Sequence, residues 1–219
     1  MDKVFAIIIL AVAGYLLGSI PTAIIAGKVL KNIDIRQHGS GNAGATNVFR
    51  VLGWRAGLVV LIIDILKGFL AAWLLIRLFP QLWSDTDSRL YWQIMAGIIA
   101  ILGHIWTIFA GFRGGKGVGT AAGVVLGLQP LPVLICLIVF ILIVAKTHYV
   151  SLGSIISAIL LPMILLADKL LLHLDIPVAM ILLSILLALL IIFTHRQNIK
   201  RLIQGNENKI SFTKKEDSA

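Results

Sequence analysis

The chain is built from long apolar runs, separated by short stretches that carry charge, glycine or proline. A helix needs about 20 mostly apolar residues to cross the hydrocarbon core of a bilayer. Only 13% of the 219 residues are charged, against about 25% in soluble domains. The sequence therefore predicts an all-α integral membrane protein with seven transmembrane helices, near residues 4–27, 53–79, 91–110, 119–128, 131–147, 151–171 and 177–194.

The fourth of these runs, GTAAGVVLGL at 119–128, is too short to cross a bilayer alone, and Pro130 and Pro132 follow it directly. Interrupted helices are tolerated inside a membrane only where protein or a cavity satisfies the freed backbone groups. We therefore expect one short or broken span near residues 119–130. Joining 119–147 into a single kinked helix would give six spans instead.

The distribution of lysine and arginine predicts how the chain is oriented. With seven spans and an outside N-terminus, fourteen of the 19 cationic residues fall inside and four fall outside. Cationic residues concentrate in the cytoplasmic loops of membrane proteins, so we expect the N-terminus outside and the C-terminus in the cytoplasm. The formal net charge of +9 suits anionic membrane lipid and requires no nucleic acid. One transmembrane domain is expected over 1–209, followed by a cytoplasmic tail over 210–219.

Three polar stretches, 31–55, 110–120 and 194–209, face the same side in this topology, with a smaller fourth at 146–154. Glycines cluster beside cations in two of them, as GSGNAG and as GFRGGKGVG. Backbone N–H groups can approach an anion closely where no side chain intervenes, and the N-terminus of a following helix attracts negative charge. These stretches therefore predict a phosphate-binding site at one membrane face.

Neither glycine cluster has the context of a nucleotide-binding motif. Residues 39–44 match G-x-G-x-x-G, but that fingerprint follows a strand in a βαβ unit, and here a transmembrane run precedes it. A Walker A loop needs four residues between its glycines and a serine or threonine after the lysine. Only three residues separate Gly111 from Gly115, and Gly117 follows Lys116. Binding of a dinucleotide or a nucleoside triphosphate is therefore not expected.

Inside the second apolar run, Asp64 and Lys67 are three positions apart and share one face of a helix. Ionisable residues within a membrane are candidates for function, but a mutually neutralising pair also explains them, and we assign both a structural role. The single cysteine, Cys136, excludes an intrachain disulfide, and zinc-type spacing is absent. No metal is expected.

Three motifs carry a resemblance to a known family. They read GSGNAGATNVFRVLG from residue 39, GHIWTIFAGFRGGKGVGT from residue 103 and HRQNIKRLIQGNENK from residue 195. On these motifs the chain resembles the bacterial acyl-phosphate:glycerol-3-phosphate acyltransferases over essentially its whole length. The departures leave the polar positions intact: Trp106-Thr107, Gly119 and Ala43 stand where Phe-Pro, Ala and Pro are usual.

The resemblance implies transfer of a fatty acyl group from acyl phosphate to the sn-1 hydroxyl of glycerol 3-phosphate, giving 1-acylglycerol 3-phosphate and phosphate, for phospholipid biosynthesis. It implies a protein of the bacterial inner membrane, in contact with membrane lipid, with its site on the cytoplasmic side. We expect a monomer. Catalytic roles are implied for Ser40, Arg50, Lys116, His195 and Asn198. Substrate or phosphate binding is implied for Gly41, Asn42, Thr46, Asn47, Gly114, Gly115, Gly117 and Ser154, and a structural role for Glu207.

The chemistry of these residues agrees with that reaction. Arg50 can hold a phosphate through two hydrogen bonds, and Lys116 acts as a point charge. Acyl phosphate is already an activated donor, so no cofactor is required. Ser40 is expected to donate a hydrogen bond rather than to form an acyl-enzyme.

Two choices stay open. The base for the glycerol hydroxyl is either His195 or a phosphate oxygen of the donor, and we favour the phosphate because no carboxylate in the motifs is placed to orient the imidazole. The alternative function is an organic-phosphate or lipid transporter. The outer loops 80–90 and 172–176 carry no glycine–cation cluster, which favours a one-sided site and thus an enzyme.

Overall fold

The computed structural model describes residues 3–210, and these residues form helices and connecting segments without a strand. The all-α class expected from the apolar runs is therefore confirmed for this part of the chain. The α-helices are α1 Lys3–Ser19, α2 Thr22–Lys31, α3 Ala45–Leu52, α4 Trp54–Phe69, α5 Thr86–Ile105, α6 Val118–Leu128, α7 Pro130–Thr147, α8 Val150–Leu170, α9 Val178–Thr194 and α10 Arg196–Ile203. Shorter helical turns cover Ile35–Gln37, Leu70–Leu74, Leu75–Leu78, Pro80–Leu82 and Ile108–Ala110.

Length and composition identify the segments that can cross a membrane. Within residues 3–210, five segments are long and apolar enough, and the number rises to six if α9 and α10, which are bent by 62° at their junction, are taken as one span. The run near 119–128 is the short apolar helix α6, with 11 residues. The five long segments are Lys3–Lys31, Trp54–Leu78, Ser88–Ala110, Pro130–Thr147 and Val150–Leu170.

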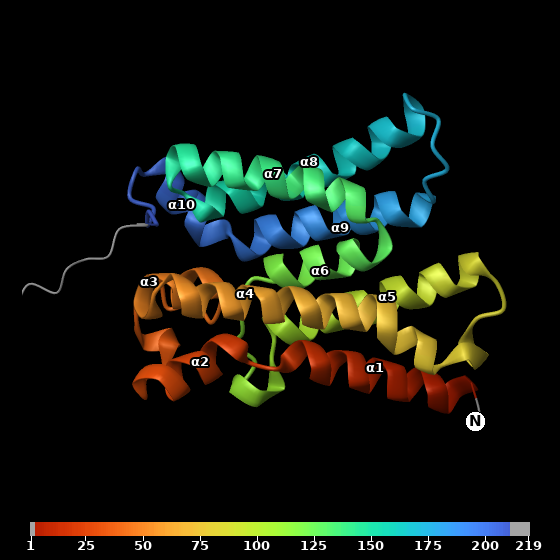
Figure 1. The fold of residues 1–219 in the computed structure, drawn as a ribbon, viewed down its shortest axis with the longest axis horizontal. Helices are drawn as coiled ribbons and strands as arrows, with labels where there is room; N and C mark the ends of the chain where they lie inside the picture. Colours follow the sequence, from red (N-terminus) through yellow and green to blue (C-terminus); the bar gives the residue numbers. More distant parts are fainter. Residues whose placement is uncertain (1–2, 211–219) are drawn as a thin grey trace, which may run out of the picture.

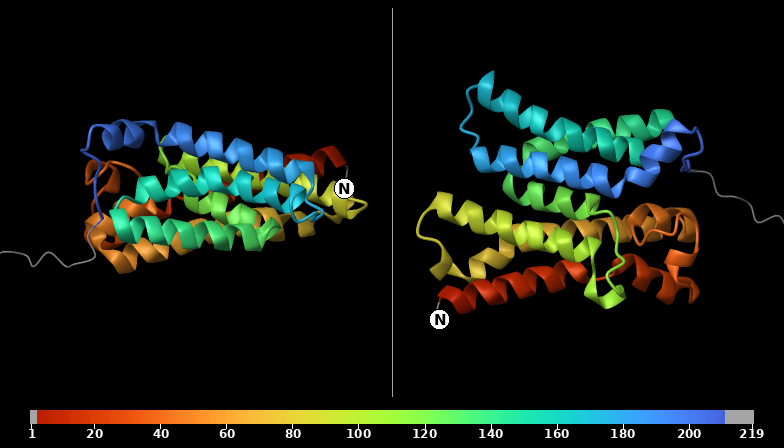
Figure 2. Two further views of the ribbon diagram at one scale, coloured as in Figure 1. Left: turned by 90° about the horizontal axis from the view of Figure 1, so that it is seen from above. Right: turned by 180° about the vertical axis from the view of Figure 1, so that it is seen from behind.

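The long helices lie alongside one another, with α6 in the middle of the bundle (Figure 1). The views in Figure 2 agree that α1, α4 and α5 lie on one side of α6, and that α7, α8 and α9 lie on the other. The start of α1 lies at the opposite end of the bundle from α2, α3 and α10. The polar stretches of the sequence thus gather at one end.

The first apolar run, expected as one segment over 4–27, is divided in the structure. α1 ends at Ser19 and α2 begins at Thr22. Pro21 lies between them and has no N–H to contribute to a continuous helix. At this break the backbone oxygen of Ile20 accepts a hydrogen bond from Nζ of Lys67 at 3.1 Å, so the break gives a buried cation of α4 a partner.

Glycines let α4 and α6 approach closely. A Cβ atom at Gly123 would lie 1.9 Å from the backbone oxygen of Ile65, and one at Gly68 would lie 2.1 Å from that of Thr120. Small residues at helix crossings inside membranes permit this kind of close backbone contact. The contact fixes the start of α6 next to α4, and the glycine–cation loop of residues 110–117 leads directly into it.

Candidate active site

The first glycine-rich loop is folded around the side chain of Asn47. Its amide oxygen accepts a hydrogen bond from the backbone N–H of Ser40 at 2.8 Å, and its amide nitrogen donates to the backbone oxygens of Ile35 and His38, both at 2.9 Å. Gly39 has φ +61°, and a Cβ atom there would lie 2.3 Å from Oδ1 of Asn47. Only glycine fits that position without strain, and in this loop geometry Ser40 lines the cavity described below.

Arg50 lies on α3 and joins this helix to the C-terminal segment. One terminal nitrogen of its guanidinium donates to the backbone oxygen of Asn208 at 2.9 Å. Its Nε atom is buried and has no hydrogen-bond partner within residues 3–210. Burial lowers the pKa of Arg50, an effect that the carboxylate of Glu207 opposes. A buried donor without a partner is costly, and an anion in the cavity would satisfy it.

The second glycine-rich loop is held against the end of α5. The backbone oxygen of Ile105, the last residue of α5, accepts a hydrogen bond from the N–H of Gly114 at 3.0 Å. The backbone oxygen of His104 accepts one from the N–H of Gly115 at 3.1 Å. Carbonyl groups at a helix C-terminus lack partners within the helix, and these two bonds supply them. The next residue, Lys116, is thereby held at the end of α5.

Lys116 connects the second loop to the bend between α9 and α10. Its ammonium donates a hydrogen bond to Oδ1 of Asn198, and its backbone oxygen accepts one from the hydroxyl of Thr194 at 3.1 Å. Burial lowers the pKa of Lys116 to about 8, and the carboxylate of Glu207 partly opposes this shift. The lysine is therefore charged at neutral pH, and a moderate rise in pH removes its charge.

His195 lies at the bend that follows α9, and Asn198 lies on α10; the two are 3% and 5% exposed. Nδ1 of His195 is 2.8 Å from the backbone oxygen of Ile191, and this partner assigns the proton to Nδ1 because a carbonyl oxygen only accepts. Burial, together with the nearby charge of Lys116, lowers the pKa of His195 to about 4. The imidazole is therefore neutral at physiological pH.

Glu207 ties α8, α10 and the C-terminal segment together. Its Oε1 accepts hydrogen bonds from the hydroxyl of Ser151 at 3.0 Å and from Nδ2 of Asn198 at 2.7 Å. Its Oε2 accepts one from Nε of Arg201 at 2.7 Å. Burial acts to raise the pKa of Glu207, but these hydrogen bonds outweigh it and hold the pKa below its ordinary value. The carboxylate is therefore ionised and fully partnered.

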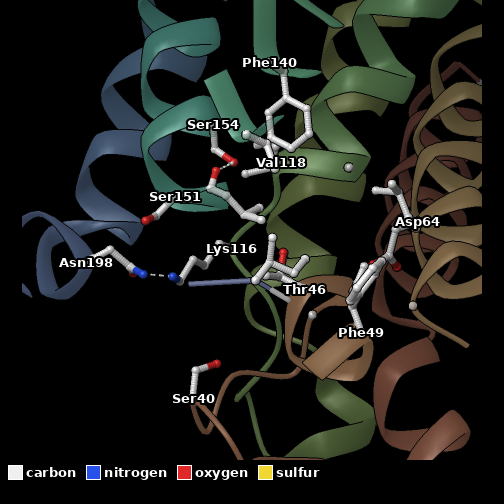
Figure 3. A pocket seen from close by; sticks show the side chains of 18 of the residues that line it. Ser40, Thr46, Phe49, Asp64, Lys116, Val118, Phe140, Ser151, Ser154 and Asn198 are labelled. Atoms are coloured by element: carbon white, nitrogen blue, oxygen red, sulfur yellow. Dashed lines mark hydrogen bonds between the residues drawn. The ribbon is translucent and has the colours of Figure 1, made fainter. Parts of the chain in front are cut away.

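One side of a cavity of about 370 Å³, across from Asp64, is lined by Ser151, Ser154, Lys116 and Asn198 (Figure 3). Figure 3 shows Lys116 and Asn198 meeting on that side, with Ser40 near one end and Phe140 near the other. Leu58 and Ile141 line the cavity and are also 45% and 54% exposed on the outer surface of the bundle, so the apolar wall adjoins the surface that faces lipid. Further apolar lining residues are Phe49, Leu61, Val118, Val144, Ala145, Val150 and Ile210.

The structure brings most of the predicted site residues to this cavity. Those on its wall are Ser40, Thr46, Arg50, Asp64, Lys116, Gly117, Ser154, His195, Asn198 and Glu207. Those that do not line it are Gly41, Asn42, Asn47, Lys67, Gly114 and Gly115. Asn47 organises the first loop, and the two glycines bind the end of α5. The hydroxyl of Ser154 donates to the backbone oxygen of Val150 at 3.0 Å.

The expected pair inside the second apolar run is present. Oδ1 of Asp64 lies 2.9 Å from Nζ of Lys67, and each residue is 3% exposed. Two lining residues with polar side chains were missed at the sequence level, His104 and Ser151. The available signals were a histidine in the last turn of an apolar run and a serine three positions before Ser154 on one helix face.

The donor set of the site suits an anion. Among residues 3–210, no three His, Cys, Asp or Glu side chains are grouped so that they could hold a metal ion. The wall instead carries a guanidinium, an ammonium, a hydroxyl and an amide, from Arg50, Lys116, Ser40 and Asn198. Such groups bind phosphate through charge-assisted hydrogen bonds.

Comparison with known proteins agrees with this chemistry. Residues 8–205 match the family described as glycerol-3-phosphate acyltransferase. The glycerol-3-phosphate acyltransferases of Chlorobaculum tepidum and Chlorobaculum parvum are each 46% identical to the chain, covering 93% and 90% of it and 96% and 94% of their own lengths.

A solved structure is also similar. The crystal structure of PlsY (YgiH), an integral membrane glycerol 3-phosphate acyltransferase, in its glycerol 3-phosphate form has a TM-score of 0.79 and 36% identity, over 94% of this chain and 96% of that one. The lysophosphatidic acid form of the same enzyme gives the same values. The chain therefore belongs to the glycerol-3-phosphate acyltransferase family and is a membrane acyltransferase rather than a transporter.

Proposed function

We propose that this enzyme transfers a fatty acyl group from acyl phosphate to the sn-1 hydroxyl of glycerol 3-phosphate, giving 1-acylglycerol 3-phosphate and inorganic phosphate. The observation that carries the proposal is the convergence of Ser40, Arg50, Lys116, His195 and Asn198 on one cavity that also has an apolar wall. Both substrates carry phosphate, which needs cations and N–H or O–H donors, and the donor carries a fatty chain, which needs apolar surface. The cavity offers both.

In this proposal the polar side binds the phosphates. The buried Nε of Arg50 and the ammonium of Lys116 supply charge, and the hydroxyl of Ser40 donates a hydrogen bond. The glycerol oxygen attacks the acyl carbon, a tetrahedral intermediate forms, and the bond from that carbon to the phosphate oxygen breaks. Phosphate leaves with the electron pair of that bond. The chemistry requires no cofactor, because the mixed anhydride already contains a good leaving group.

A phosphate oxygen of the donor is proposed to take the proton from the glycerol hydroxyl, while His195 binds and orients substrate. Two observations support this division. Nδ1 of His195 donates to the backbone oxygen of Ile191 and not to a carboxylate, so no acid stabilises an imidazolium. The pKa of about 4 also makes the imidazole a weaker base than an ordinary histidine.

The proposed topology has seven spans, an outside N-terminus and a cytoplasmic site in the bacterial inner membrane. The start of α1 and the helix α10 lie at opposite ends of the bundle (Figure 1), which supports an odd number of crossings with α6 as the short one. The bias of lysine and arginine supports the orientation. We propose a monomer as the working unit.

The donor is tested with purified enzyme in lipid vesicles, glycerol 3-phosphate, and either palmitoyl phosphate or palmitoyl-CoA. We expect stoichiometric phosphate and 1-acylglycerol 3-phosphate with palmitoyl phosphate alone. Product from palmitoyl-CoA and none from palmitoyl phosphate would overturn the proposed donor. A pH–rate profile that keeps its shape in His195→Gln supports the phosphate as base, and loss of one limb of that profile would assign the proton to His195.

A further inference from the structure

Three buried polar side chains converge on Asp64 from α2, α4 and α5. Its Oδ1 accepts a hydrogen bond from the hydroxyl of Thr22 at 2.7 Å, and lies 2.9 Å from Nζ of Lys67 and 3.5 Å from Nδ1 of His104. All four residues are at most 8% exposed. Of these four residues, Asp64 and His104 line the cavity of the candidate active site, and the other two do not. The cluster therefore connects the membrane-embedded ion pair to the substrate side of the molecule.

His104 contacts the second glycine-rich loop with its backbone and with its ring. Nδ1 faces the carboxylate of Asp64, which keeps the proton on that nitrogen. Nε2 faces the loop, since a Cβ atom at Gly115 would lie 2.2 Å from it. The backbone oxygen of His104 accepts the N–H of Gly115 at 3.1 Å, and a Cβ atom at Gly114 would lie 1.9 Å from that oxygen. The loop therefore lies directly on His104.

We propose that His104 is a positioning residue for Lys116. Asp64 fixes the imidazole, the imidazole and its backbone oxygen fix the two glycines, and Lys116 follows them in the chain. Glycine stands on both sides of Lys116, so its backbone position depends on the contacts of these glycines and on the hydrogen bond from the hydroxyl of Thr194 to its backbone oxygen. The inference rests on the proposal above that Lys116 binds substrate phosphate. It gives the buried Asp64 a role in substrate binding through His104, in addition to neutralising Lys67.

This role predicts a particular change in the kinetic constants. A displaced Lys116 weakens its contact with phosphate in the ground state and in the transition state alike, so the KM for glycerol 3-phosphate rises while kcat changes little. A role confined to folding would reduce the amount of active enzyme, which lowers the apparent kcat and leaves the KM unchanged. Comparing the change in KM with the change in kcat therefore distinguishes a positioning role of His104 from a role confined to folding.

The test uses the purified full-length enzyme with His104→Asn, with Gly115→Ala and with both. Asparagine keeps a donor near the Nδ1 position and removes the outer ring atoms, whereas Gly115→Ala adds the methyl group that the ring excludes. Each single variant is expected to raise the KM for glycerol 3-phosphate about tenfold. The double variant is expected to stay near tenfold instead of reaching about a hundredfold, because the methyl group occupies the vacated space.

The matched control is His173→Asn, in the exposed segment between α8 and α9, which leaves both constants unchanged. Size-exclusion elution and melting temperature in detergent report folding. If His104→Asn yields little folded enzyme, His104→Gln replaces it, because its amide reaches the Nε2 position beside Gly115, and the KM is expected to rise less than about threefold. A larger rise in the folded His104→Gln enzyme would contradict the contact.

Two results would overturn the inference: effects of the two substitutions that multiply, or an unchanged KM in folded His104→Asn. Lys116→Gln separates this inference from the proposed function. An unchanged KM in Lys116→Gln would remove Lys116 from the substrate site and overturn that assignment itself. An effect at Lys116 without any effect at His104 overturns only the positioning role.

Discussion

Lys116 donates a hydrogen bond from its ammonium to the side-chain oxygen of Asn198, although the two residues are 82 positions apart in the chain. The amide nitrogen of the same asparagine donates to Oε1 of Glu207 at 2.7 Å. The neutral amide therefore lies between the ammonium of Lys116 and the carboxylate of Glu207, which both line the cavity. This arrangement keeps the charge of Lys116 available to a phosphate, whereas a carboxylate in direct contact would neutralise it.

Replacing that amide by a carboxylate should disable the site. Asn198→Asp would pair with Lys116 and place two carboxylates together at Glu207, so we expect kcat/KM for glycerol 3-phosphate to fall by about 100-fold or more. Steady-state kinetics of the purified variant measure this. Asn206→Asp, in the exposed part of the same C-terminal segment, is the control and should retain activity. Near-normal kcat/KM in Asn198→Asp would show that the amide does not protect the lysine charge.

The pKa of Lys116 predicts an alkaline limit to substrate binding. Burial brings this pKa to about 8, and the charged form exists below that pH, so kcat/KM for glycerol 3-phosphate should fall as the pH rises through about 8. Arginine keeps its charge at every pH used. In Lys116→Arg the alkaline limb should therefore move upward, whatever the absolute activity. Profiles between pH 6 and pH 10 test this, and an identical limb in both enzymes would assign it to another group.

Local patterns in the sequence predicted the helices and the outline of the site. Apolar run length located the long apolar helices, of which five qualify as spans by length and composition within residues 3–210. The glycines beside cations located the loops that carry Ser40 and Lys116. The spacing of three between Asp64 and Lys67 predicted their ion pair, which the structure confirms. These features depend on residues near one another in the chain, where helical periodicity and turn chemistry act directly.

Contacts between distant segments could not be predicted in the same way. Thr22 and His104 reach Asp64 from two other helices, and no spacing in the sequence relates them. Asn47 also differs from its expected role: the resemblance implied substrate or phosphate binding, but the first glycine-rich loop is folded around its amide. Pro21 is a signal for the division of the first span, because proline interrupts a helix. The apolar residues on both sides of it favour one continuous helix instead.

Glu207 should contribute to stability in a pH-dependent way. Its pKa is held below the ordinary value by its hydrogen bonds, so its contribution is present at neutral pH and is lost as the pH falls through the folded-state pKa. Glu207→Gln removes the charge that Arg201 pairs with. We expect its melting temperature in detergent to be lower by about 5 °C at pH 7, and the difference from the unmodified enzyme to shrink as the pH falls through the folded-state pKa of Glu207. A difference that stays constant down to pH 3 would contradict this account.

Variants of the Asp64–Lys67 ion pair inside α4 should distinguish its contribution to stability from its contribution to substrate binding. Asp64→Leu leaves the buried ammonium of Lys67 uncompensated, which costs about 3–5 kcal/mol when one partner of a buried pair is removed. Adding Lys67→Met removes that charge, so the double variant should recover most of the melting temperature. Its KM for glycerol 3-phosphate should remain raised, because His104 still lacks the carboxylate. Recovery of stability and KM together would limit Asp64 to charge neutralisation.

The contact between α4 and α6 should be sensitive to a single methyl group. A Cβ atom at Gly123 would lie 1.9 Å from the backbone oxygen of Ile65, and backbone on both helices cannot yield as a side chain can. Gly123→Ala should therefore force the helices apart and cost about 1–3 kcal/mol. Gly14→Ala is the control in α1, since its Cβ atom would meet nothing closer than the backbone oxygen of Ala96 at 3.4 Å.

Both glycine variants are compared by melting temperature in detergent and by the KM for glycerol 3-phosphate. Gly14→Ala should match the unmodified enzyme in both. Gly123→Ala should lower the melting temperature and also raise the KM, because α6 begins at Val118, two residues after Lys116. A lower melting temperature with an unchanged KM would mean that the glycine–cation loop keeps its position without α6, through its hydrogen bonds to Ile105, His104 and Thr194.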